Sequence, residues 1–566
     1  MVSPHLKRKT QELPHVSPGA QKLLKTVYNQ QNREEGETEA PKIRVSELIS
    51  KMAFYYEKIR NSVDYNEEYL LRKDAIERIL KRQIVIESII KASKSEEIAK
   101  HLLVELIRAG YLPNNKVPED KIREVGRIIE KYIKLRNYSL PSLASSLNLS
   151  PSEKRTKAEK KNIEERRDLN NWILALAASE IEENLGRDEV KETVVKNLFE
   201  YLNSNIQLPE NSSYRKDLKI QIYISIHRKF LKFDDDMLSF ILFKYFNGEW
   251  KAAGDEEIKS IGENIDAHRQ AINKQLEHPL ARQIDKVVGR YSIFYSILTD
   301  MMREDPVYFY NVVSSKPEVF SDLAKKIFNK RFKQSKSKLW RAATRSIIYI
   351  FLTKSIFVII LEVPATKWLG ETIDPLSLAI NILFPPFLLF LAVFFTRLSN
   401  EENTSRVIEG VKEITFQEDQ RSEPVYLRSP SKRGRVSNFV FGTFYSLTFL
   451  ISFGAVVWIL DQIGFNWVSI IIFLFFLAFV SFFAIRIRKT TREFIIVEPK
   501  ENIFTFLLDF FSIPIIAVGK WLSQRFSRLN VFVFILDFII EAPFKVFVEI
   551  AEQWTKYVKE RKDDIV

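Results

Sequence analysis

Residues 346–363 read SIIYIFLTKSIFVIILEV, an apolar run interrupted by two charges, Lys354 and Glu362. Three further apolar runs follow, at 375–396, 439–460 and 467–485. The four runs contain 18 to 22 residues, and an α-helix needs about 20 residues to cross a bilayer. Tryptophans lie near their ends, as in the aromatic belts of membrane proteins, at Trp340, Trp368, Trp458 and Trp467. We therefore predict four transmembrane helices and disfavour the alternative, a very large soluble core.

Basic residues predict the orientation of these helices. The connection 398–436 carries seven Lys and Arg residues, whereas 364–374 carries one and 461–466 carries none. Loops rich in Lys and Arg stay on the cytoplasmic side. Residues 1–345, the loop 398–436 and the segment after 486 are thus expected in the cytoplasm, with both termini. The polar start of the chain, 1–40, has no signal-peptide pattern.

The segment just before the first run is strongly basic. Residues 325–345 contain nine basic side chains and no acid, and each basic residue near an anionic membrane surface contributes about 1 kcal/mol. The segment either determines the topology or also binds anionic lipid. The candidate lipid-binding residues are Lys325, Lys326, Lys330, Arg331, Lys333, Lys336, Lys338, Arg341 and Arg345.

Polar residues inside the runs are candidate functional groups, because an ionisable side chain at membrane depth is costly. Lys354 must therefore extend its ammonium group to the membrane surface, form an ion pair or line a water-filled cavity. Glu362 and Asn381 are further candidate sites, and Pro385 and Pro386 are predicted to kink the second helix. The candidate partners of Lys354 are Glu371, Asp374, Asn381, Asp509 and Asp537.

The C-terminal region contains a short internal repeat. FTFLLDFFSIP at 504–514 aligns with FVFILDFIIEAP at 532–543, so that Asp509 matches Asp537. Each copy ends near a proline, Pro514 or Pro543, and the second copy adds Glu541 to a charged stripe. We prefer two amphipathic helices in the cytoplasmic interface over two more spans, because the connection between the copies is basic. We expect Asp509 and Asp537 to face water or basic residues. The alternative is that they form a proton or ion relay.

The rest of the chain reads as helices, which makes the fold class all-α. The predicted parts are a tail at 1–44, a helical domain at 45–138, a linker at 139–168 and a second helical domain at 169–345. The membrane region follows at 346–486, and the C-terminal interfacial helices and tail occupy 487–566. In the loop 398–436 we expect a short strand pair formed by 410–417 and 423–429, which could dock on the N-terminal helices.

The sequence indicates no enzyme, cofactor or metal site. The chain has no cysteine and six dispersed histidines, and it lacks phosphate-loop, dinucleotide and hydrolase motifs. Asp234, Asp235 and Asp236 could bind a cation, but three acids before a helical run are more typical of a helix N-terminus. Of the net charge of +13, residues 1–345 carry +12.

The stretches LTKSIFVIILEVP and LAINILFPPFLLFL resemble uncharacterised multi-pass membrane proteins of small-genome bacteria. This resemblance implies a bacterial inner membrane and brings no known activity or site residues with it. We expect a membrane-anchored scaffold whose helical region binds a protein partner. A transporter or channel using Lys354, Asp509 and Asp537 is the alternative, and a nucleic-acid tether is a weaker one, since the basic patches of 154–167 are mixed with acids. A homo-oligomer is compatible with the sequence.

Overall fold

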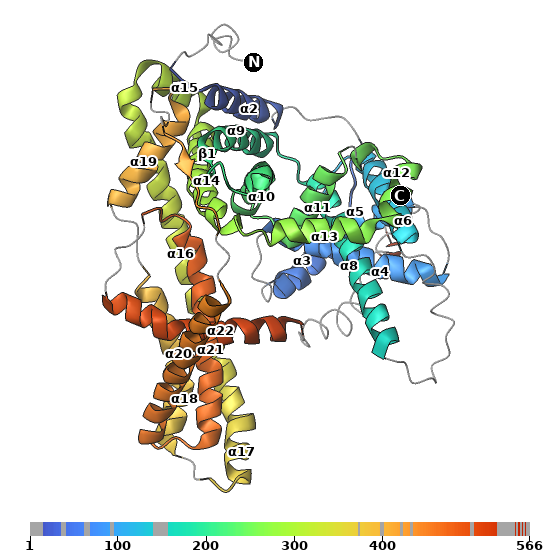
Figure 1. Cartoon of the computed structure of the whole chain (residues 1–566). Coiled ribbons are helices and arrows are strands. Elements are labelled where there is room, and N and C mark those ends of the chain that lie inside the picture. The colour runs from blue at the N-terminus through green and yellow to red at the C-terminus, as the bar shows by residue number, and fades with distance from the viewer. Residues whose placement is uncertain are drawn as a thin grey trace. The chain divides into compact units, whose positions relative to one another are not determined.

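The computed structural model describes most of the chain, in ranges separated by gaps. These ranges are 15–34, 41–61, 68–90, 95–139, 157–248, 250–371, 374–396, 401–418, 421, 423–430, 434–497, 503–528, 550, 553–554, 557–558 and 561. The described residues are almost all helical, which confirms the all-α class (Figure 1). The chain divides into two compact units. The helical unit comprises Lys25–Ser292, Glu423–Ser429 and Val531–Val566, and the spanning unit comprises Met1–Leu24, Ile293–Ser422 and Pro430–Asn530.

The helical unit is a set of amphipathic helices around one core. The core joins buried residues of 43–135 with those of 169–272, so the parts on either side of the expected linker pack together. Its helices are α3 (Glu47–Asn61), α4 (Glu68–Ile90), α5 (Ser95–Arg108), α6 (Asp120–Ser139), α8 (Lys157–Leu185), α9 (Glu189–Asn205), α10 (Leu218–Lys229), α11 (Asp235–Phe246), α12 (Asp255–Glu263) and α13 (Ile265–Leu276), with 3-10 turns at Arg215–Asp217 and Trp250–Ala252.

The predicted linker is shorter than expected, because α8 already begins at Lys157. Its first turns, KAEKKNIEE, consist mainly of Ala, Lys and Glu, which are strong helix formers. The central part of α8 packs against α4, α6 and α11. The remainder of the linker, 140–156, lies outside the described residues.

Three carboxylates in α8 tie this helix to its neighbours. Glu180 accepts a hydrogen bond from Lys131 Nζ of α6 at 2.7 Å and another from Trp250 Nε1 at 2.9 Å. Glu182 forms a two-pronged pair with Arg72 of α4 at 2.7 Å. Glu183 pairs with Lys244 of α11. Since Glu180 and Lys131 are both buried, removal of either partner would leave an uncompensated charge in the core.

The triad of aspartates at the start of α11 acts as a helix cap. Asp234 accepts a hydrogen bond from the backbone N–H of Met237 at 2.9 Å. Asp234 and Asp236 also each accept a hydrogen bond from Lys73 Nζ at 2.8 Å. The buried ammonium of Lys73 therefore occupies the position where a cation would have to bind.

The expected strand pair in the loop 398–436 is wrong. Residues 410–415 belong to α19 (Glu401–Thr415), because Val407, Val411 and Ile414 are buried at helical spacing. In the other segment, β2 (Val425–Tyr426) pairs in parallel with β1 (Ile206–Gln207) of the helical unit. Gln283 also exchanges hydrogen bonds with the backbone of Arg428. The segment 423–429 therefore docks on the N-terminal helices, as the sequence suggested.

The spanning unit contains four helices that are long and apolar enough to cross a membrane, in agreement with the four predicted spans. The first extends continuously over Pro317–Trp368 and the others are α18 (Pro375–Phe394), α20 (Arg435–Gln462) and α21 (Trp467–Arg492). The first span consists of a 3-10 turn (Pro317–Val319), α16 (Phe320–Phe357), a π-helical turn (Val358–Glu362) and α17 (Val363–Trp368). The helix α15 (Pro306–Ser315) precedes it, and α2 (Pro18–Glu34) and α14 (Ala281–Glu304) belong partly to each unit.

The first copy of the C-terminal repeat forms α22 (Ile503–Arg528), which lies across α20 and α21 rather than alongside them (Figure 1). Pro514 does not end this helix, and the connection expected at 520–530 is helical as far as Arg528. The close packing of α22 on α21 depends on Gly519, where a Cβ atom would clash with the carbonyl oxygen of Ala478. The second copy, 532–543, with Asp537, Glu541 and Pro543, lies outside the described residues.

His227 of α10 makes the stability of the helical unit sensitive to pH. The imidazole is buried between Tyr223 and Phe233, and its Nδ1 donates to the carbonyl oxygen of Tyr223 at 2.8 Å. Burial lowers the pKa of His227 from 6.5 to about 4. The unfolded chain therefore binds more protons than the folded chain between these two values, so stability falls as pH decreases through this window.

We expect the helical unit to lose about 3 kcal/mol of stability between pH 6.5 and pH 4 through His227, since one pKa unit corresponds to about 1.4 kcal/mol. The variant His227→Gln keeps a donor for the Tyr223 carbonyl but does not titrate, so its stability should change less over this range. Hydrogen exchange of α10 in the full-length protein, corrected for the intrinsic pH dependence of exchange, measures this difference. Equal pH dependence in both proteins would contradict it.

Candidate functional site: a polar cluster inside the helical bundle

The candidate site begins at an irregularity in the first span. Between α16 and α17, the backbone N–H of Val363 donates to the carbonyl oxygen of Val358, five residues earlier, so this turn is π-helical. Pro364 follows directly and has no N–H to donate to the carbonyl of Ile360, which explains why the regular pattern is disturbed here. Such π-helical turns are frequent at functional sites.

The π-helical turn brings Lys354 and Glu362 onto the same face of the helix. In a regular α-helix with 3.6 residues per turn, side chains eight residues apart differ in direction by about 80°. One inserted residue reduces this difference to about 20°. Lys354 Nζ lies 3.9 Å from Glu362 Oε2, and neither side chain is exposed at all.

Glu362 links three helices through its carboxylate. Its Oε1 accepts hydrogen bonds from Asn381 Nδ2 of α18 at 2.6 Å and from Ser469 Oγ of α21 at 2.7 Å. Asn381 Nδ2 also lies 3.3 Å from the carbonyl oxygen of Ser469. Asn381 and Ser469 are as deeply buried as Glu362. The four residues Lys354, Glu362, Asn381 and Ser469 are called the polar cluster below.

The ammonium of Lys354 has an aromatic environment in addition to the carboxylate. Its Nζ lies 4.1 Å from the ring centroid of Phe476 in α21 and 5.9 Å from that of Phe357. A cation above an aromatic face is stabilised by the ring quadrupole. This contact and the nearby carboxylate explain how a lysine can be buried completely inside an apolar bundle.

The polar cluster leaves three buried polar atoms without a hydrogen bond. In the part of the chain that the structure describes, Lys354 Nζ, Glu362 Oε2 and Asn381 Oδ1 have no hydrogen-bond partner. A distance of 3.9 Å is too long for a hydrogen bond between the first two. Unsatisfied buried groups are costly and rare in native proteins, so each calls for an explanation.

The sequence identified part of this cluster. It named Lys354, Glu362 and Asn381 as polar sites, and the structure brings all three together. It did not pair Lys354 with Glu362, because regular helical spacing places them on different faces. Ser469 was missed, although it lies near the start of the fourth span, as Asn381 lies near the start of the second span, which runs in the same direction.

The other candidate residues lie elsewhere. Asp374, proposed as a partner of Lys354, caps α18 by accepting hydrogen bonds from Ser377 N at 2.8 Å and Ser377 Oγ at 2.7 Å. Asp509 is exposed on α22 and interacts electrostatically with Arg488, as expected if it faces basic residues. Pro385 and Pro386 are buried within α18, which continues through them as one helix.

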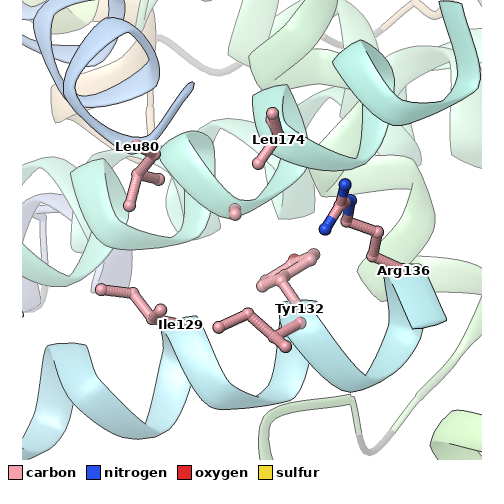
Figure 2. Close-up of a pocket in the computed structure, with 7 residues that line it drawn as sticks. Leu80, Ile129, Tyr132, Arg136 and Leu174 are labelled. Carbon is pink, nitrogen blue, oxygen red and sulfur yellow. The ribbon is translucent and has the colours of Figure 1, made fainter. Parts of the chain in front are cut away.

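The helical unit contains a small cavity between α4, α6 and α8 (Figure 2). Its volume is about 10 Å³, near the lower limit for a single water molecule. The lining is mostly apolar, and it consists of Leu80, Ile129, Tyr132, Ile133, Arg136, Leu174 and Ala177. This cavity is a packing gap and offers no room for a substrate.

Comparisons with known proteins give no relative from which a site could be transferred. Neither the models of protein families nor the curated proteins nor the solved structures match this chain. The polar cluster must therefore be interpreted from its own geometry.

Removal of one partner of the pair should destabilise the bundle more than removal of both. The variant Lys354→Met leaves the Glu362 carboxylate buried beside an apolar group, and the expected cost is about 3 kcal/mol or more. The double variant Lys354→Met/Glu362→Gln removes both charges and should recover part of this loss. Thermal unfolding of the detergent-solubilised full-length protein measures the change.

A matched control is Lys367→Met, which removes an exposed lysine from α17 of the same span. It should leave stability within about 0.5 kcal/mol of the original protein. The interpretation of Lys354 and Glu362 as an interacting pair would be wrong if the effects of the single variants Lys354→Met and Glu362→Gln simply added in the double variant.

Proposed function

We propose that this chain is a multi-pass membrane protein that holds its helical unit at the cytoplasmic face of a bacterial inner membrane, as a platform for a protein partner. The observation that carries the proposal is the continuity of the first span. Its 52 residues from Pro317 to Trp368 correspond to about 78 Å of helix. A bilayer core of about 30 Å accommodates less than half of this length. The remainder is available as a rigid support outside the membrane.

The part of α16 outside the expected span buries one of its faces against other helices, which is consistent with a rigid supporting element. Phe320, Ala324 and Phe328 are buried on one face, and the ring of Phe320 contacts that of Phe416 with centroids 4.9 Å apart. The helix α19 also packs on α16. A lone exposed helix would have no reason to bury such a face.

The fourth span is held to this support by Asn403 of α19. Its Oδ1 accepts hydrogen bonds from the backbone N–H groups of Ile496 and Val497, at 2.7 Å and 3.2 Å, and its Nδ2 donates to the carbonyl oxygen of Phe494 at 3.0 Å. Asn403 is almost fully buried. The chain leaving α21 is thus fixed to the same extramembrane layer as α16.

The basic face of α16 supports contact with anionic lipid. Lys326 and Lys330 lie 4.0 Å and 3.2 Å from carboxylate oxygens of Glu304, and Arg331 lies 3.1 Å from a carboxylate oxygen of Asp300. Nearer the span, four exposed basic residues have no ion pair with any described residue, namely Lys333, Lys338, Arg341 and Arg345. Their charge remains available for lipid phosphates.

We expect the triple variant Lys333→Gln/Lys338→Gln/Arg341→Gln to weaken contact with anionic lipid. Each lost charge should cost about 1 kcal/mol, and the effect should shrink in high salt. Hydrogen exchange of residues 326–345 in nanodiscs, with and without anionic lipid, measures the contact. The control Lys326→Gln/Lys330→Gln removes charges already paired with Glu304 and should have a smaller effect. Equal protection in neutral and anionic discs would contradict lipid binding.

Exposed aromatic residues on the helical unit support a protein partner. The side chains of Tyr55 on α3 and Tyr245 on α11 are 64% and 54% exposed, and Phe246 beside Tyr245 is 39% exposed. Tyrosine and phenylalanine are enriched at protein interfaces because they bury a large area at a small entropic cost. Isolated exposed aromatics are common, so the test must compare them with another exposed position.

A photo-crosslinking amino acid placed at Tyr55 or Tyr245 should give a discrete adduct with a second protein in intact cells. The control position is Glu256, an exposed charged residue on α12 of the same unit. Mass spectrometry of the adduct identifies the partner. The platform function would be refuted if neither aromatic position gave a protein adduct above the level seen at Glu256.

A further inference from the structure

We infer that Lys354 and Glu362 form a proton-binding site that exchanges with water at one end of the bundle only, the end that carries the connections 364–374 and 461–466. This activity is independent of the platform function. The pair has room for a proton, a polar route leads from it to one end of the bundle, and an apolar layer closes the other end.

The pair of Lys354 and Glu362 is buried, but one carboxylate oxygen accepts no hydrogen bond from the described residues, which leaves a binding position for a proton. Glu362 Oε1 already accepts two hydrogen bonds, whereas Oε2 accepts none from the described residues. An added proton would therefore bind at Oε2 and leave the contacts of Oε1 intact. A metal cation is disfavoured because the ammonium of Lys354 already lies 3.9 Å from this oxygen.

No other titratable group among the described residues contacts the pair from the neighbouring helices. Asn381 of α18 and Ser469 and Phe476 of α21 face it, and none of these titrates. The carboxylates at the same end of the bundle are the half-buried Asp374, held by Ser377, and the exposed Glu371 and Asp461. Glu362 is therefore the group whose protonation would be observed.

Buried polar side chains connect the pair with one end of the bundle. Along α18, Asp374, Ser377 and Asn381 follow at helical spacing, and Ser377 and Asn381 are buried. Ser377 Oγ lies 3.5 Å from the carbonyl oxygen of Gly464 in the connection. On α21, Asn466 caps the helix through the N–H of Ser469, at 2.8 Å. Small movements of these side chains would admit water.

An apolar layer separates the pair from the opposite, basic end. Ile350 lies one turn from Lys354 and one turn from Ser346 on the same buried face of α16, so it separates these two polar side chains. The layer consists of tightly packed aliphatic residues from α16, α18 and α21, namely Leu339, Ala343, Ile350, Leu389, Val393, Val480, Ala484 and Ile487. Between Lys354 and Ser346 the aliphatic layer offers no hydrogen-bond partner to a water molecule. The site should bind protons without conducting them.

The test is infrared difference spectroscopy of the full-length protein in sealed proteoliposomes as the external pH is lowered. We expect a C=O band of a protonated carboxyl group that grows when the end with connections 364–374 and 461–466 faces the acid. The band should be absent in Glu362→Gln and retained in Asp374→Asn, the matched control. Because the chain has no native cysteine, Gln462→Cys with an impermeant thiol reagent reports which end faces outward.

A second variant keeps the test decisive if Glu362→Gln does not fold. In Lys354→Met the pH dependence of the band should differ from that of the wild type, because the nearby positive charge is lost. An identical difference spectrum in the wild type and Glu362→Gln, or no shift in Lys354→Met, would overturn the proposal. So would a transmembrane proton flux that Glu362→Gln abolishes, which would instead favour a transporter. None of these results depends on the crosslinking of a partner.

Discussion

The spanning unit depends on the Glu362 carboxylate, which joins the first, second and fourth spans. In a membrane the hydrophobic effect does not hold helices together, because lipid chains are as apolar as the side chains they replace. Interhelical hydrogen bonds and close packing must supply specificity. Asn381 and Ser469 bind the same oxygen of Glu362, so the rotation of α18 and α21 about their axes is fixed by a single group. The aliphatic layer around Leu389 and Val480 then packs in register.

In the helical unit, carboxylates likewise link several helices. Glu180, Glu182 and Glu183 of α8 each bind a cation from a different helix. These contacts are short, whereas Lys354 Nζ and Glu362 Oε2 are separated by 3.9 Å. The carboxylates of the helical unit, each paired with a cation, are explained as structural links between helices. Glu362 Oε2 is not explained in this way, and this difference distinguishes the polar cluster from the other buried charges.

The sequence predicted the spans well because hydrophobic length is a direct physical requirement of the bilayer. It also found Lys354, Glu362 and Asn381, since charges and amides are conspicuous in apolar runs. It could not find the pairing, because that depends on a π-helical turn caused by Pro364. The strand expected at 410–417 was wrong because Val407, Val411 and Ile414 follow a helical period and are buried on one face of α19. Ser469 could have been found from the sequence, because it lies near the start of the fourth span, which runs in the same direction as the second span with Asn381.

The polar cluster and the basic segment before the first span belong to one helix. Glu362 and the basic residues around Arg341 belong to the same continuous helix, Pro317–Trp368. A proton added at Glu362 would change the net charge buried against α18 and α21. The contacts of the polar cluster with these two helices would then change. At its other end the same helix packs on α19 and holds the Phe320–Phe416 contact, so these contacts and Glu362 belong to one element of the chain.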